Sequence, residues 1–150
     1  VICRCGKRGC LETGASGSAV HRIFMEKLAQ KRVSMLSDKY NRGEQILLED
    51  ILEALGQEDV LAIEVMETVG HTLGKAMAGL INLFNPDLIV LGGTLAVAKD
   101  YIMLPLKSAI NKYSLQLVNK DTTIKLSKLG EKAGAVGACM LSRSKMLGLM

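Results

Sequence analysis

Three cysteines stand close together near the start of the chain, at Cys3, Cys5 and Cys10. Gly6 and Gly9 lie between them, and glycine adopts at little cost the positive φ angles that a tight loop requires. Zinc binds thiolates in tetrahedral sites, whereas a disulfide framework spreads its cysteines and needs an oxidising compartment. The cluster therefore predicts a zinc loop. The alternative is a reactive or coincidental cysteine-rich loop.

The fourth zinc ligand is not evident from the residues. The two histidines, His21 and His71, fall within helical patterns, where a surface or core role is expected. Three basic residues border the thiols, and we expect them to favour thiolates and to offset the negative charge of the site. They are Arg4, Lys7 and Arg8.

Glu12 follows the last cysteine of the cluster by two residues. If a metal clamps the loop, this carboxylate is held in a defined place and can accept hydrogen bonds from a polyhydroxylated ligand. The alternative is a carboxylate at the start of a helix, where the helix dipole favours it. The physics of the residue alone favours the second interpretation.

Gly92, Gly93 and Thr94 directly follow the apolar run 88–91, which is typical of a strand buried on both faces. A glycine turn after a strand leaves backbone N–H groups at the carboxyl edge of a sheet, where α/β proteins bind phosphates and nucleotides. Glycines also serve simply to turn the chain there, so both interpretations stay open. Neither of the glycine-rich phosphate-binding motifs is present, that is, neither GxGxxG nor GxxxxGK followed by Ser or Thr.

The apolar spacing also predicts the elements that position these residues. We expect helices over 15–33, 48–55, 58–83, 98–113 and 130–147, strands over 88–91 and 122–126, and a loop or broken helix over 34–44. Gly70, Gly74 and Ala78 form a smooth ridge that another element can approach closely. Helices alternating with strands predict an α/β layer with parallel strands, and two strands are too few for a stable sheet.

Composition excludes several classes of protein. The chain has 150 residues, 49% of them hydrophobic and 3% aromatic, with a net charge of +4. This apolar content excludes a disordered tail, and the few aromatics argue against a stacking platform for single-stranded nucleic acid. The most apolar run, 76–86, contains Asn82 and is about half the length of a membrane span. No secretory signal is visible, so we expect a cytoplasmic protein without a membrane partner. The chain opens on Val1 and a cysteine cluster, so we also expect it to be a fragment of a longer protein.

The run Cys3-x-Cys5-Gly6-x-x-Gly9-Cys10-Leu11-Glu12 resembles the zinc-loop signature of the ROK family. This family groups bacterial sugar kinases and sugar-responsive transcriptional repressors. Residues 85–93 and 133–138 resemble its late strand with the nucleotide-side turn and its closing helix. The resemblance implies that 1–150 is the carboxy-terminal part of a ROK sugar-binding domain with an actin-like, ribonuclease H-like α/β fold. In this division the zinc loop is 1–12 and the α/β layer is 13–150.

The resemblance also implies roles for particular residues. Zinc would be held by the three clustered cysteines together with a His upstream of the chain, and Glu12 would contact the sugar. Gly92, Gly93 and Thr94 would face ATP only in a kinase. The family's catalytic residues lie upstream, so none is expected in this chain.

The family contains both sugar kinases and repressors, and two features of this chain bear on the choice between them. The kinases often carry a third glycine where Thr94 stands, and residues 103–111 and 144–148 look closer to the repressors for N-acetylglucosamine and xylose. We therefore expect the sugar-sensing effector region of a repressor that a sugar or sugar derivative releases. Its DNA contacts would come from an upstream region, and it would form a homodimer or tetramer. The alternative is a sugar kinase that transfers phosphate from ATP to a hexose or N-acetylhexosamine.

Overall fold

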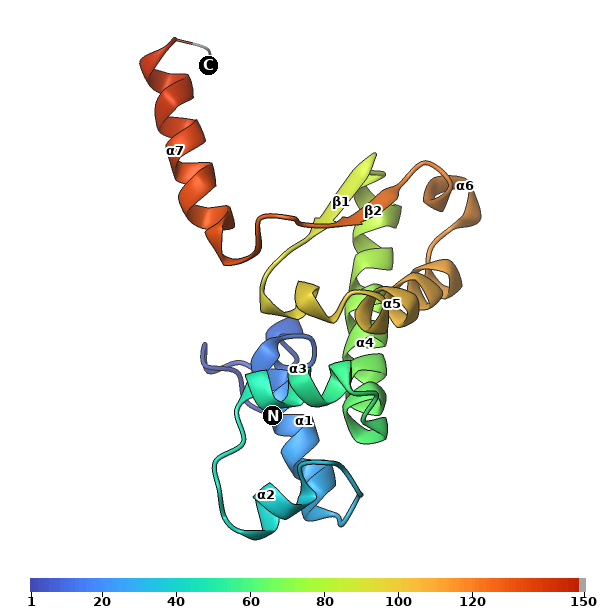
Figure 1. The fold of residues 1–150 in the computed structure, drawn as a ribbon. Coiled ribbons are helices and arrows are strands. Elements are labelled where there is room, and N and C mark those ends of the chain that lie inside the picture. Colours follow the sequence, from blue (N-terminus) through green and yellow to red (C-terminus); the bar gives the residue numbers. More distant parts are fainter. Residues whose placement is uncertain (149–150) are drawn as a thin grey trace.

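The computed structural model describes residues 1–148, and the side chains of all of these except 118, 119 and 131. Its helices are α1 (Gly17–Ala29), α2 (Ser37–Asn41), α3 (Leu48–Gly56), α4 (Val60–Phe84), α5 (Asp100–Tyr113), α6 (Gln116–Asn119) and α7 (Ala133–Met146), with short 3₁₀ turns η1 (Leu11–Thr13), η2 (Thr94–Ala98) and η3 (Gly130–Lys132). Strands β1 (Leu88–Leu91) and β2 (Thr123–Leu126) pair in parallel, Leu88 opposite Thr123 (Figure 1). The predicted α/β layer with parallel strands is confirmed.

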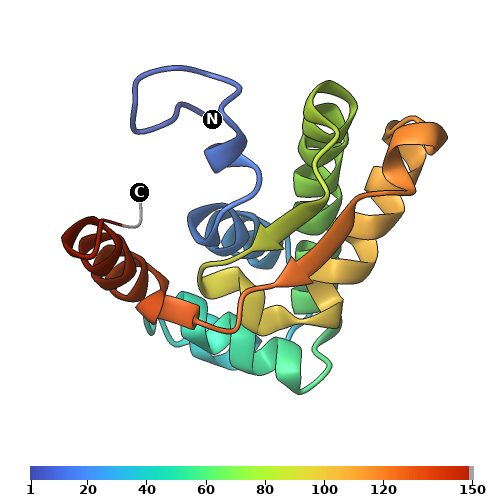
Figure 2. The ribbon, with the colours of Figure 1, turned by 90° about the horizontal axis from the view of Figure 1, so that it is seen from above.

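Helix α4 is the central element of the core. It contacts α5, α1 and α3, and its buried face includes Leu61, Val65 and Val69. In both views of the ribbon, α4 stands between the N-terminal loop and α6, and α7 lies apart from α4 and α5 (Figures 1 and 2). No helix within residues 1–148 is long and apolar enough to cross a membrane.

The glycine ridge on α4 is confirmed as a site of close packing. A Cβ atom added at Gly70 would lie 2.7 Å from Cγ of Pro105, and one added at Gly74 would lie 2.8 Å from Cβ of Ala109. Both neighbours belong to α5, and Ala78 on the same ridge is buried. Because α5 already covers the ridge, the ridge cannot serve as the contact between two chains.

The first predicted helix, 15–33, is shorter in the structure. Helix α1 ends at Ala29, and Lys31 takes a φ angle of 63°, which breaks the helical path. Val33, which lies within the predicted helix, is 84% exposed. The following segment, 34–44, contains the short α2, as a broken helix would.

Asp59 connects the segment before α2 to the start of α4. Its side chain is buried, with Oδ1 accepting from the N–H of Ala62 at 2.8 Å and Oδ2 from the N–H of Met35 at 2.7 Å. Glu58 takes a φ angle of 62°, so α4 begins at Val60 rather than at the predicted 58. One carboxylate thus serves as the helix cap and as a tie to a distant loop.

The prediction that β1 is buried on both faces is wrong. Leu88 and Val90 are 49% and 57% exposed, while Leu91 is buried and Ile89 packs partly against the core. The physical reason is that the described helices cover one face of the two-stranded sheet. Strand β2 alternates in the same way, with the exposed Thr123 preceding the half-buried Ile124.

The ridge predicts opposite effects for two glycines of the same helix. We expect Gly74→Ala to lower the free energy of unfolding by about 1–3 kcal/mol, because the new methyl group overlaps α5. Gly79 has open space around the position of a Cβ, so Gly79→Ala is expected to raise it by about 0.5–1 kcal/mol. Urea unfolding of both variants measures this, and equal effects would contradict the packing of α5 on Gly74.

Candidate functional site

The N-terminal loop folds back on itself through two glycine turns. The N–H of Cys3 donates to the carbonyl of Lys7 at 2.8 Å, and the N–H of Gly6 donates to the carbonyl of Cys3 at 2.9 Å. Gly6 and Gly9 have φ angles of 81° and 78°, as their role in the predicted loop requires. The backbone alone therefore brings the cysteines to one side of the loop.

The three thiols form a group that suits a tetrahedral metal ion. The Sγ atoms of Cys3, Cys5 and Cys10 all lie within 4.8 Å of one another, and those of Cys5 and Cys10 are 3.5 Å apart. Zinc–sulfur bonds of about 2.3 Å at tetrahedral angles separate the sulfurs by about 3.8 Å. Among the described residues, no other Cys, His, Asp or Glu joins this group. The donor set fits zinc with three protein ligands from this loop.

Hydrogen bonds give the thiols different proton affinities. The backbone N–H of Lys7, followed by the thiols of Cys10 and Cys3, lowers the pKa of Cys5. Contacts with the thiol of Cys5, followed by that of Cys3, raise the pKa of Cys10. We expected basic side chains to favour the thiolate, but the largest contribution comes from a backbone donor. Such a donor stays in place when the long side chains move.

The two histidines have structural roles, as predicted. Nε2 of His21 lies 2.8 Å from the carbonyl oxygen of Ile46, and the ring of His71 stands edge-on to Tyr113 at 5.7 Å. Neither belongs to the thiol group. A fourth ligand from an upstream His therefore stays a prediction.

The backbone around Glu12 is held from both sides. Glu12 lies in η1, which begins directly after Cys10. The hydroxyl of Thr13 donates to the carbonyl of Cys10 at 2.7 Å, and the hydroxyl of Ser16 donates to the carbonyl of Glu12 at 2.7 Å. Arg22 donates to the carbonyl of Thr13 at 2.9 Å. The turn is thus fastened to the cysteine loop and to α1.

The carboxylate of Glu12 is exposed and has no hydrogen bond or ion pair with any described residue. It lines a cleft of about 170 Å³ whose walls include Cys3, Arg4 and Arg22. Helix α1 begins only at Gly17 and has no acidic residue in its first turn, so Glu12 is not a charge at the start of that helix. Sequence reasoning missed Arg22, because no local pattern relates a residue within α1 to the loop.

The glycine turn lies at the carboxyl edge of the sheet, as predicted. Gly93 has a φ angle of 87°, and the N–H of Ser127 after β2 donates to the carbonyl of Leu91 at 2.8 Å. The turn leads into η2, with Thr94 exposed, and α5 begins only at Asp100 instead of the predicted 98. No α-helix starts directly at the turn.

A model of the ROK family matches residues 1–145, and the chain belongs to this family. Among curated relatives, it is 33% identical over 143 residues to a glucokinase of Halalkalibacterium halodurans, covering 95% of this chain and 43% of that protein. It is 34% identical over 145 residues to the DNA-binding transcriptional dual regulator NagC of Escherichia coli K12, covering 97% of this chain and 34% of that protein. The chain spans less than half the length of these relatives.

Solved structures of the family share the fold. A ROK glucokinase from Streptomyces griseus in complex with glucose and AMPPNP superposes with a TM-score of 0.81 at 27% identity, covering 96% of this chain and 47% of that one. A ROK transcriptional regulator, a homologue of the E. coli Mlc protein, gives 0.74 at 34% identity, covering 84% and 31%. The α/β fold is that of ROK kinases and regulators, and both kinds of protein match at similar identity.

The thiol group predicts a metal-binding test with a matched control. We expect Cys5→Ser to weaken zinc binding by more than about 100-fold. Loss of a residue that only hydrogen-bonds to a metal ligand already costs about 10–100-fold in metal affinity, and loss of the ligand itself costs more. Cys139→Ser removes the cysteine outside the loop and is expected to leave zinc content unchanged. Metal analysis of the purified full-length proteins measures this. Zinc retained in Cys5→Ser, or absent from the wild type, would contradict the metal site.

Proposed function

We propose that this chain is the sugar-sensing effector region of a ROK transcriptional regulator, within the carboxy-terminal part, 1–150, of its sugar-binding domain. The observation that carries the sugar-sensing part of the proposal is the unpartnered carboxylate of Glu12, fastened by its backbone to the thiol loop. In this proposal the protein is cytoplasmic, assembles as a homodimer or tetramer, and contacts DNA through an upstream region.

Zinc would be held by Cys3, Cys5 and Cys10, with an upstream His as the fourth ligand, and would supply a structural cross-link between the two ends of the loop. The position of Glu12 then follows from the covalent chain, because its turn starts where the third ligand, Cys10, ends. The carboxylate accepts hydrogen bonds from two neighbouring sugar hydroxyls, and such charge-assisted bonds are stronger than neutral ones.

Arg22 supports the wall of the cleft in this proposal. Its guanidinium already bonds the carbonyl of Thr13 and, through Nη1, the carboxylate of Glu26 at 2.8 Å. It therefore helps to hold the turn of Glu12 in position. The cleft of about 170 Å³ is smaller than the about 300–1,000 Å³ of a complete small-molecule pocket. These residues contribute one wall of the sugar site.

Two features of the glycine turn support a regulator. Thr94 stands where the kinases often carry a third glycine, and the turn continues into a 3₁₀ helix. Phosphates bind well where several N–H groups at the start of a helix point at one place. Five residues of 3₁₀ helix followed by a break at Lys99 offer less of this arrangement.

The second candidate is a sugar kinase, supported by the similarity to glucokinases. In this alternative, Gly92, Gly93 and Thr94 face ATP, which donates its terminal phosphate to a hexose or N-acetylhexosamine. None of the catalytic residues would come from this chain.

An activity assay separates the two candidates. We expect the full-length protein to bind a hexose or N-acetylhexosamine, without forming ADP when ATP is present. We also expect the sugar to lower its affinity for operator DNA, because a ligand shifts an equilibrium by its differential affinity for the two states. Coupled ADP detection and DNA-binding titrations measure this. Sugar-dependent ADP formation would establish the kinase alternative and overturn the regulator.

The role of Glu12 is tested by removing its charge. We expect Glu12→Gln to weaken sugar binding by about 10–100-fold, since a hydrogen bond to a charged group contributes about 1.5–3 kcal/mol. Zinc content should not change. Glu67→Gln makes the same substitution on the exposed face of α4 and serves as the control. Calorimetric titration of the sugar measures both, and equal affinity of the wild type and Glu12→Gln would overturn the proposed contact.

A further inference from the structure

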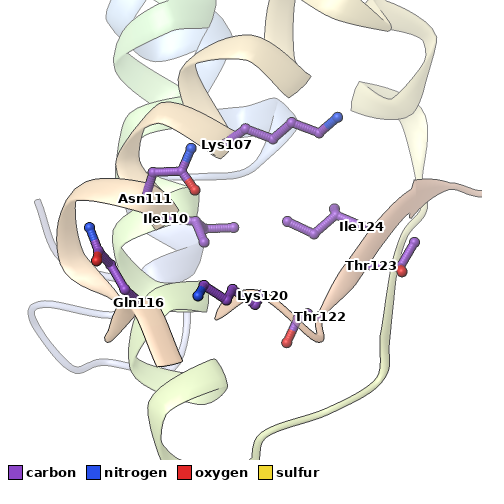
Figure 3. A pocket seen from close by; sticks show the side chains of 8 residues that line it. All are labelled: Lys107, Ile110, Asn111, Gln116, Lys120, Thr122, Thr123 and Ile124. Atoms are coloured by element: carbon purple, nitrogen blue, oxygen red, sulfur yellow. The ribbon is translucent and has the colours of Figure 1, made fainter. Parts of the chain in front are cut away.

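A second cavity, of about 660 Å³, lies between α5, α6 and the start of β2 (Figure 3). Its volume falls in the range of about 300–1,000 Å³ that small-molecule sites occupy. It shares no lining residue with the cleft at Glu12, and α4 stands between the N-terminal loop and α6, one of the elements that line the cavity (Figures 1 and 2). It is therefore distinct from the sugar site proposed above and does not depend on that proposal.

The lining combines an apolar floor with polar groups around it. Ile110 of α5 is 1% exposed, and Ile124 of β2 packs partly against the core. Lys107 of α5 and Lys120, directly after α6, contribute two ammonium groups, and Gln116 of α6 adds an amide. Figure 3 shows the two lysines on opposite sides of Ile110, with their ammonium groups pointing apart. Two lysines from different elements thus line one cavity.

The lysines have no acidic partner among the side chains that the structure describes. Neither Lys107 nor Lys120 forms an ion pair with these side chains, and the ion pairs that they do form all join residues between 22 and 64. The stretch 101–120 contains three lysines and no Asp or Glu. Asp121 follows Lys120 in the sequence but does not line the cavity. The cavity therefore presents positive charge that nothing in the described chain neutralises.

From this geometry we propose that the cavity binds a small phosphate monoester. Lys107 and Lys120 would supply the positive charge, because lysine binds phosphate as a point charge on a flexible stem, and the amide of Gln116 would donate to a phosphate oxygen. The carbon skeleton of the ester would lie on Ile110 and Ile124. Two lysines are too few for the extended backbone of a nucleic acid, which needs a row of cations, and they suit a small ligand better.

The test uses glycerol 3-phosphate, inorganic phosphate and glycerol as probes, titrated calorimetrically into the full chain. Glycerol 3-phosphate carries the ester without a sugar ring, so the cleft at Glu12 has no ring to recognise. We expect it to bind more tightly than inorganic phosphate, and glycerol not to bind. Equal affinity for glycerol 3-phosphate and inorganic phosphate would show that the cavity binds a free phosphate ion and does not select an ester. Absence of binding by both would overturn the proposed site.

A charge-matched pair of double variants tests the location. Lys107→Met with Lys120→Met should weaken binding of glycerol 3-phosphate by at least about tenfold. The control, Lys75→Met with Lys112→Met, removes the same charge beside the ring of Tyr113, outside the cavity, and should change affinity less than twofold. The four lysines are exposed, so the fold is retained, and circular dichroism checks this. Equal losses in both variants would overturn the cavity as the site.

Discussion

The close approach of α5 to α4 is the contact on which the other positions depend. It requires backbone without side chains at Gly70 and Gly74, and it places Pro105 directly on Gly70. Asn82 of α4 then fastens the end of α5, since its amide donates to the carbonyl of Tyr113 at 3.3 Å and its oxygen accepts from the N–H of Leu115 at 2.9 Å. Strand β1 follows α4 in the chain and is connected to α5 through η2, and β2 follows α5 through α6. The sheet, the glycine turn and the second cavity are therefore all positioned by one helix contact.

The cysteine loop is built on a different principle, because it contributes no buried residue to the core. Its shape comes from backbone hydrogen bonds and two left-handed glycines, and its connection to the core runs through Thr13, Ser16 and Arg22. A metal ion can stabilise such a loop where apolar burial does not, because binding free energy then acts as folding free energy. Glu12 lies at the junction of the cysteine loop with the core, so the position of its backbone depends on the loop and on α1.

The features that could be predicted from the sequence are those set by local chemistry. Gly6 and Gly9 turn the loop, because each acts within a few residues of itself. Burial could not be predicted in the same way: the run of β1 is apolar throughout, and only the arrangement of helices decides that Leu88 is exposed. Helix α6 has four residues and is too short to show a period. The second cavity depends on the turn that this short helix makes, so nothing in the spacing of its lysines indicates it.

The buried carboxylate of Asp59 has a consequence for local motion. It accepts from an amide of the segment after α1 and from an amide in the first turn of α4, which are separated by more than twenty residues. Opening either segment leaves a buried carboxylate oxygen without its donor, and that loss is costly. The amides of Met35 and Ala62 should therefore exchange with solvent in one shared opening event, although the first belongs to an irregular segment and the second to the longest helix.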